Sequence, residues 1–213
     1  MYGVRSPFRG LRPPTLPSRI PKARSAMECM RILESARQYP WPTRFERVRA
    51  VAILGMALFA GLRRGEILRL HSLDVDLQQG LIRVERGKGR GGGKDRVVPI
   101  GPDLREILED YLAERRRHNL TPPEFFTCLR SRAGVSLSTF NRVIRRVRQA
   151  SQIPFAFHSL RHSFLTQLLR SGVPIHTVSA LAGHTQITTT AGYLKVFDED
   201  KEDAVRRLRY GAF

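Results

Sequence analysis

The chain has 213 residues, 41% of them hydrophobic, which is enough to build the core of one domain of moderate size and argues against a disordered protein. Lysine and arginine number 37 against 19 acidic residues, and the resulting net charge of +18 favours a polyanionic partner, first of all nucleic acid. A membrane partner is disfavoured, because no strongly basic amphipathic helix with exposed aromatic residues stands out and the longest apolar run, residues 50–62, is too short to cross a bilayer.

Residues 1–24 are predicted to form an extended, solvated arm or linker. They contain five prolines and six basic residues but no acidic one, and a helix cannot continue through so many prolines. Proline and arginine also interrupt the first residues before the apolar stretch of a signal peptide could form. We therefore place the start of the folded domain at residue 25, and its end at residue 213.

Two helices are predicted next, separated by the PWP segment at residues 40–42. The first runs from a Ser25 cap to about residue 39, and the second from about residue 43 to 58. The second contains the long apolar run, which predicts a helix buried in the core. The expected apolar stripe of the first helix consists of Met27, Met30 and Leu33.

A β-hairpin is predicted from two short strands, residues 81–85 and 96–100, joined by a glycine-rich connection that contains Lys88 and Lys94. The connection is not a nucleotide-binding Walker A loop. For Lys94 to be the lysine of that motif, position 88 would have to be glycine and position 95 serine or threonine, and the chain has Lys88 and Asp95.

The rest of the chain is predicted to be helical, which makes the fold class mainly α with a small antiparallel sheet (α+β). Ser138 can cap a helix that has an apolar face and an arginine-rich face. We expect the basic face to enter a DNA groove, with a solvated surface as the alternative. The expected helices are 103–117, 138–150, 158–171, 174–182 and 198–209, and the arginines of the basic face are Arg142, Arg145, Arg146 and Arg148.

Reactive side chains also stand near predicted ends of helices. His158 and Arg161 are three residues apart, so on a helix they share a face and can grip one anion. His158 and His162 have a spacing that zinc sites use, but no glutamate beside the first histidine and no acidic third ligand accompany them. We therefore expect no metal and no cofactor. Tyr193, nine residues after His184, would by itself be an ordinary partly buried tyrosine.

In their order these segments resemble the tyrosine recombinase family of phage integrases and Xer-type recombinases. GLRRGEIL (61–68) resembles the family's GLR-x-x-E-L box, and the hairpin from residue 87 to 100 resembles its GKG…K-x-R-x-VP-L segment. HSLRHSF (158–164) resembles H-x-L-R-H, and LAGH…T…Y (181–193) resembles the closing box. The resemblance covers residues from about 5 to 213.

The resemblance implies DNA cleavage and rejoining through a covalent 3′-phosphotyrosine intermediate. Tyr193 would be the nucleophile and His158 its acid/base partner. Lys88 would be the general acid for the leaving oxygen, although the long glycine-rich tip keeps Lys94 as an alternative. The residues implied to bind the scissile phosphate are Arg63, Arg161 and His184.

Other residues have supporting roles in this hypothesis. Glu66 is expected to orient a neighbouring arginine or to cap a helix. Arg64 and His162 are expected to lie behind the phosphate site or to contact DNA phosphates, with a solvated face as the alternative. Together with Lys94 and the basic helix, they complete the predicted DNA-binding set.

Relatives of this family usually have an N-terminal core-binding domain joined by a proline-rich basic linker, which residues 6–25 resemble. The chain is therefore expected to lack that domain, as a fragment, a minimal recombinase or a decayed remnant. A type IB topoisomerase and a non-catalytic DNA-binding protein are the alternatives. The implied partner is double-stranded DNA, bound by a protein that is a monomer when free and a tetramer on DNA, linked by helix 198–209.

The two cysteines, Cys29 and Cys128, form no CxxC pair, which is consistent with free thiols in a reducing compartment. We expect a cytoplasmic protein that associates with the nucleoid.

Overall fold

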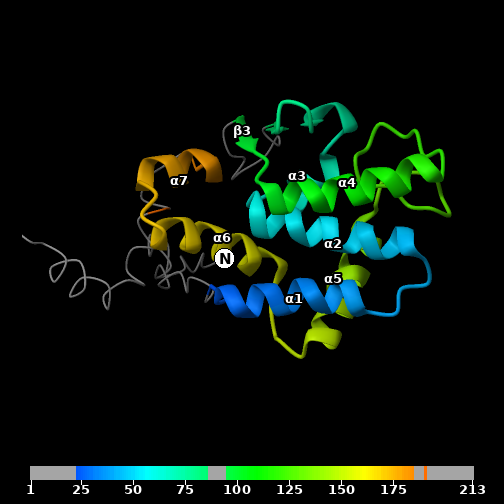
Figure 1. Ribbon diagram of the computed structural model, residues 1–213, viewed down its shortest axis with the longest axis horizontal. Helices are drawn as coiled ribbons and strands as arrows, with labels where there is room; N and C mark the ends of the chain where they lie inside the picture. The colour runs from blue at the N-terminus through cyan, green and yellow to red at the C-terminus, as the bar shows by residue number, and fades with distance from the viewer. Residues whose placement is uncertain (1–22, 86–94, 185–189, 191–213) are drawn as a thin grey trace, which may run out of the picture.

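The computed structural model describes residues 23–85, 95–184 and 190. This part of the chain forms seven α-helices and one small sheet (Figure 1), so the predicted fold class is confirmed. The helices are α1 (Ala26–Gln38), α2 (Arg44–Phe59), α3 (Arg64–Arg69), α4 (Pro102–Arg117), α5 (Leu137–Ser151), α6 (Phe157–Arg170) and α7 (Ile175–Ala182). The strands are β1 (Val75–Asp76), β2 (Leu81–Val84) and β3 (Arg96–Pro99), and a short 3₁₀ helix, η1 (Ser72–Asp74), precedes β1.

The core is built around α2, as its apolar sequence predicted. Its residues from Val48 to Leu58 are all buried, because α4, α6 and α1 pack against different sides of it. Figure 1 shows α2 between α4 on one side and α1 on the other. A helix that is apolar on every side is stable only where other elements cover all of its faces. Its C-terminal end then carries the chain directly into the segment that contains Arg63.

The sheet is antiparallel, with strand order β1-β2-β3. The two predicted strands are present, and Val84 pairs with Arg96 at the end that faces the glycine-rich connection. The connection itself, residues 86–94, lies outside the described residues. Strand β1 was not predicted, because its two residues are too few to show an alternating pattern.

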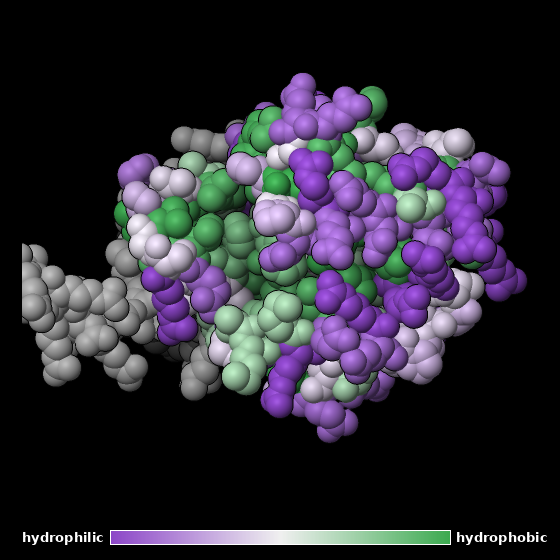
Figure 2. All heavy atoms as spheres, in the orientation of Figure 1, coloured by the Kyte–Doolittle hydropathy of each residue, from purple (hydrophilic) through white to green (hydrophobic). Residues whose placement is uncertain are grey.

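The predicted apolar stripe of α1 is wrong in two of its three residues. Met27 and Met30 are 71% and 53% exposed, whereas Cys29, Ile32, Leu33 and Ala36 are buried. Helix α1 packs against α2, α5 and α6 together, and this arrangement decides which face is covered. Figure 2 shows apolar side chains gathered over α6 and the start of α1.

Two of the predicted caps can be compared with the structure. Ser25 caps α1 through a capping box with Glu28, as expected. Helix α5 is capped by Ser136 and not by Ser138, since the Ser136 hydroxyl accepts from the backbone N–H of Thr139. Among the described helices, none is long and apolar enough to span a membrane. The predicted helix 198–209 lies outside the described residues.

Candidate functional site

The first predicted arginine is placed by a sharp turn after α2. Gly61 has a φ of +64°, a left-handed conformation that glycine adopts without strain. The turn is closed by a hydrogen bond of 3.0 Å from the backbone N–H of Leu62 to the carbonyl of Met56. Arg63 follows as the residue before the first turn of α3, with its side chain 26% exposed. Arg63 is therefore partly exposed to solvent, directly after the buried turn at Gly61 and Leu62.

Arg161 connects this turn to two other helices. It extends from α6, is only 2% exposed, and donates from Nη1 to the carbonyl oxygen of Gly61. Its Nη2 donates to the carbonyl oxygen of Ala182, at the end of α7, over 2.5 Å. A buried guanidinium needs such acceptors, because it stays charged at all physiological pH values. Arg161 therefore joins the α2–α3 turn, α6 and α7 at one point.

His184 lies at the same point. Gly183 ends α7 with a φ of 62°, and the backbone N–H of His184 bonds to the carbonyl of Ser179. The ring is held on both sides, with Nε2 at 3.4 Å from Arg161 Nη2 and Nδ1 at 2.7 Å from the hydroxyl oxygen of the buried Thr190. Arginine can only donate, so Nε2 accepts and the neutral ring carries its hydrogen on Nδ1, toward Thr190.

The rings of His158 and His162 lie against each other on α6. Their ring centroids are 4.4 Å apart in an edge-to-face arrangement. His162 is 7% exposed, so the solvated position that was its alternative is wrong, and its ring supports His158 from inside the domain. Its contact with DNA remains a prediction. His158 is at the surface, where it could meet a ligand.

The three histidines lie close enough to Arg161, and two of them to Arg63, for nearby charges to lower their pKa values. Burial, followed by the charges of Arg161 and Arg63, lowers the pKa of His184 to about 4. Partial desolvation of the ring, followed by the same two arginines, lowers the pKa of His158. Burial and the neighbouring His158 lower the pKa of His162 to about 4. The site therefore places neutral histidines beside positively charged arginines, which suits an anionic ligand.

Glu66 is the acidic residue of this positive site. It accepts from the backbone N–H of Arg63 over 2.7 Å and from Arg63 Nη1 over 2.8 Å, so it both caps α3 and orients an arginine, as expected. Arg96 of β3, which the sequence did not reveal, forms a bidentate pair with the same carboxylate at 2.9 and 2.8 Å. Burial alone would raise the pKa of Glu66, but Arg96 and Arg63 outweigh it and lower that pKa to about 2.

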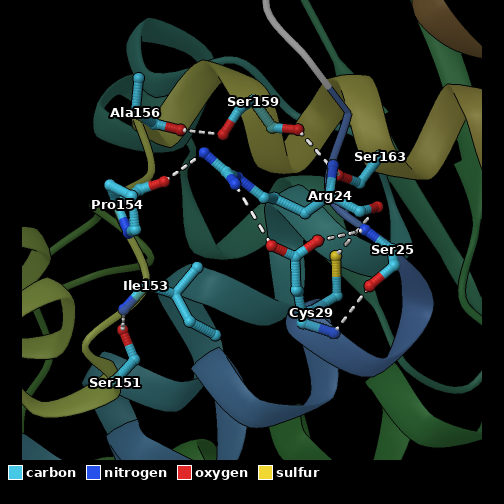
Figure 3. A network of polar contacts seen from close by, with 10 residues as sticks. Arg24, Ser25, Cys29, Ser151, Ile153, Pro154, Ala156, Ser159 and Ser163 are labelled. Atoms are coloured by element: carbon cyan, nitrogen blue, oxygen red, sulfur yellow. Dashed lines mark hydrogen bonds and ion pairs between the residues drawn. The ribbon is translucent and has the colours of Figure 1, made fainter.

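The entry into α6 is held by Arg24 (Figure 3). The Arg24 guanidinium donates to the carbonyl of Pro154 and pairs with Glu28 at 3.2 Å. The backbone N–H of Arg24 donates to the hydroxyl of Ser163 over 2.7 Å. Arg24 had been predicted in the solvated arm, and the structure corrects this. Arg24 anchors the beginning of the described chain to α6. His158 of that helix is four residues after Pro154, and Arg161 follows about one helical turn later.

The basic residues of α5 differ in their surroundings. Arg142, Arg145 and Arg148 are exposed, as a DNA-contacting face requires. Arg146 is half-buried and lies over the rings of Trp41 and Tyr39, at 5.7 and 6.0 Å from the ring centroids. Its packing against the segment after α1 corrects its assignment to the outward basic face. Arg64 is exposed at the first position of α3, and its DNA contact remains a prediction.

Three predicted side chains lie outside the described residues. They are the nucleophile Tyr193 and the two candidate general acids, Lys88 and Lys94. In the part of the chain that the structure does describe, no three His, Cys, Asp or Glu side chains are grouped to hold a metal ion.

The comparisons with known proteins agree with this arrangement. The chain matches the phage integrase family over residues 26–200. A tyrosine recombinase of Pseudothermotoga lettingae is 31% identical over 95% of this chain and 66% of the relative. The tyrosine recombinase XerA of Thermococcus kodakarensis is 37% identical over 93% of this chain and 67% of the relative. A crystal structure of XerA recombinase has a TM-score of 0.74 at 30% identity, over 91% of this chain and 68% of that one.

The chain spans about two thirds of the length of these relatives. The segments that carry Arg63, His158, Arg161 and His184 all lie within the matched residues, and the fold that brings them together is shared with the XerA recombinase structure. The chain belongs to the phage integrase family, and its described part has the fold of a tyrosine recombinase catalytic domain.

Proposed function

We propose that this chain carries the catalytic domain of a site-specific DNA recombinase, which cleaves and rejoins DNA strands through a covalent phosphotyrosine intermediate. The observation that carries the proposal is the meeting of Arg63, Arg161 and His184 at the junction of the α2–α3 turn, α6 and α7, with His158 on the adjoining surface. A site that holds two permanent positive charges beside neutral histidines is suited to a phosphodiester.

In the proposed reaction, the Tyr193 hydroxyl attacks the scissile phosphorus. A bond forms between the tyrosine oxygen and the 3′-phosphate, and the bond to the 5′-oxygen breaks. The phosphoryl group stays esterified throughout, so the strand can be rejoined without an external energy source. The pentavalent transition state concentrates negative charge on the non-bridging oxygens. Arg63 and Arg161 stabilise it, and each charge-assisted hydrogen bond contributes roughly 1.5–3 kcal/mol.

Two positions transfer protons in the proposed reaction, and His184 binds the phosphate. His158 accepts the phenol proton, and its lowered pKa keeps it in the neutral form that a general base needs at pH 7. Lys88, with Lys94 as the alternative, protonates the leaving 5′-oxygen. His184 hydrogen-bonds the phosphate. Because its Nε2 is an acceptor in the free domain, His184 must take up or relocate a proton when the phosphate binds.

The partner is double-stranded DNA, as the net charge of +18 and the exposed arginines of α5 suggest. We propose that the protein is monomeric in free solution and assembles as a tetramer on DNA. It would then act on the nucleoid.

A suicide-substrate assay tests the activity. A nicked duplex that carries the cognate site, taken from DNA flanking the gene, is incubated with protein in EDTA and analysed on a denaturing gel. We expect a covalent protein–DNA band that Tyr193→Phe removes. A band that persists in this variant would contradict the assignment. Relaxation of supercoiled plasmid by the monomer would favour a topoisomerase, and DNA binding without any covalent product would favour a non-catalytic DNA-binding protein.

A further inference from the structure

The Glu66 carboxylate binds two arginines, Arg63 and Arg96, and the second one limits how many hydrogen bonds Arg63 can give to it. The carboxylate receives four donors: two from Arg96 and two from Arg63, one of which is the Arg63 backbone N–H. A carboxylate offers about four lone-pair sites, so these donors saturate it. Only one guanidinium nitrogen of Arg63, Nη1, is hydrogen-bonded to Glu66. Among the described residues, no other hydrogen-bond partner of that guanidinium is present, so we take its remaining N–H groups to face a ligand.

The Glu66–Arg96 ion pair is buried, whereas Arg63 is partly exposed, and this difference explains why Glu66 needs Arg96. The side chains of Glu66 and Arg96 are 7% and 6% exposed, whereas that of Arg63 is 26% exposed. A buried carboxylate without Arg96 would have Arg63 as its only hydrogen-bonded guanidinium partner among the residues described. It would then draw Arg63 into a two-pronged ion pair, since burying an unpaired charge is costly. That pair would take Arg63 away from the phosphate and cancel its charge.

We propose that Arg96 is a positioning residue that occupies Glu66 and thereby keeps Arg63 available to the scissile phosphate. With two guanidinium groups on one carboxylate, the cluster keeps a net charge of +1. Arg96 is also the first residue of β3, directly after the segment that contains Lys88 and Lys94. The same ion pair therefore ties the end of the hairpin to α3, where Arg63 lies. The charge of Arg96 also reaches His184, whose pKa it helps to lower after burial and the two other arginines.

This inference depends on the proposed function, and second-site rescue tests it. In single-turnover cleavage of the suicide duplex, Arg96→Ala should cleave about 10- to 100-fold more slowly, the factor expected for loss of one charge-assisted hydrogen bond in the transition state. Its affinity for the duplex should change by less than about 3-fold. Arg96→Ala combined with Glu66→Gln should recover part of the rate, because the neutral amide no longer captures Arg63. Arg96→Lys keeps the charge and should lie between wild type and Arg96→Ala.

Two cleavage results would overturn the inference: wild-type rates in Arg96→Ala, or a slower rate in the double variant than in Arg96→Ala. A purely structural pair would also be rescued by the second change, but in the unfolding free energy, so urea unfolding of both variants separates the two roles: a cleavage rate that only follows the loss and recovery of stability would overturn the inference. Titration of the Glu66 carboxyl carbon by NMR is a second measurement that needs no activity. The pKa of Glu66 should rise in Arg96→Ala from its value of about 2, and an unchanged pKa would refute the pairing. If wild type forms no covalent product, the proposed function fails, while the titration still tests whether Arg96 pairs with Glu66.

Discussion

Gly61 offers a direct test of how the turn after α2 builds the site. Its φ of +64° is unfavourable for any residue with a Cβ. A Cβ at this position would also lie 2.5 and 2.7 Å from two ring carbons of Phe164 on α6, closer than real contacts allow. Gly61→Ala therefore adds two separate penalties, one in the backbone and one in packing.

The two penalties have different sizes. The left-handed conformation costs an ordinary residue roughly 1–2 kcal/mol. Overpacking by one methyl group against a ring that must move costs typically about 1–3 kcal/mol. We expect Gly61→Ala to lower the free energy of unfolding by roughly 2–5 kcal/mol, a large part of the roughly 5–15 kcal/mol that stabilises a domain.

Urea unfolding followed by circular dichroism measures this change. Gly172→Ala is the matched control, since Gly172 has a φ of +84° but nothing within 4 Å of its added Cβ. It should lose only the backbone part, about 1–2 kcal/mol. In a Phe164→Ala background, where the ring is absent, Gly61→Ala should also cost only this smaller amount.

Equal losses for Gly61→Ala and Gly172→Ala would refute the packing part of the argument. So would an undiminished cost in the Phe164→Ala background. Because the carbonyl of Gly61 accepts from Arg161, we expect Gly61→Ala also to slow cleavage of the suicide duplex.

Three further predictions concern the surroundings of the site. Arg24→Ala should destabilise the domain by about 1–3 kcal/mol, because it removes a charge-assisted hydrogen bond to Pro154 and an ion pair with Glu28. The unfolding free energy should fall as the pH drops from about 6.5 toward 4: burial and nearby positive charge lower the pKa values of His162 and His184 to about 4, so the unfolded chain takes up these protons first, and His162→Gln should remove part of this dependence. Arg146→Ala should destabilise by about 0.5–1 kcal/mol and change the emission of Trp41, the only tryptophan in the chain.

Variants of exposed residues serve as controls for the two arginine predictions, and each of the three predictions has one outcome that would contradict it. Arg31→Ala, on the exposed side of α1, should leave stability unchanged, and a loss equal to that of Arg24→Ala would deny the anchor. For His162→Gln, a pH dependence identical to that of wild type would contradict the lowered pKa of His162. Arg142→Ala should weaken DNA binding while stability and tryptophan emission stay the same. Equal stability losses for Arg142→Ala and Arg146→Ala would contradict the packing of Arg146 over Trp41.

Much of the fold could be predicted because local chemistry decides it. Ser25 and Glu28 form a capping box from adjacent positions, and a run of apolar residues such as 50–59 has few stable places other than a core. The order of the boxes around Arg63, Arg161 and His184 likewise predicted the family, since each box is a short continuous segment.

Other features depend on contacts between distant segments. Glu66 and Arg96 are thirty positions apart, and only the docking of β3 beside α3 makes one carboxylate serve two arginines. The exposure of Met27 and Met30 was decided in the same way, because three neighbouring helices select the buried face of α1. A residue pattern shows that a helix has an apolar side, but its orientation follows from what packs against it. The sequence by itself therefore predicted the family and the longer helices of the described residues, whereas the short α3 was not predicted, and tertiary packing decided which charges share a partner and which faces are covered.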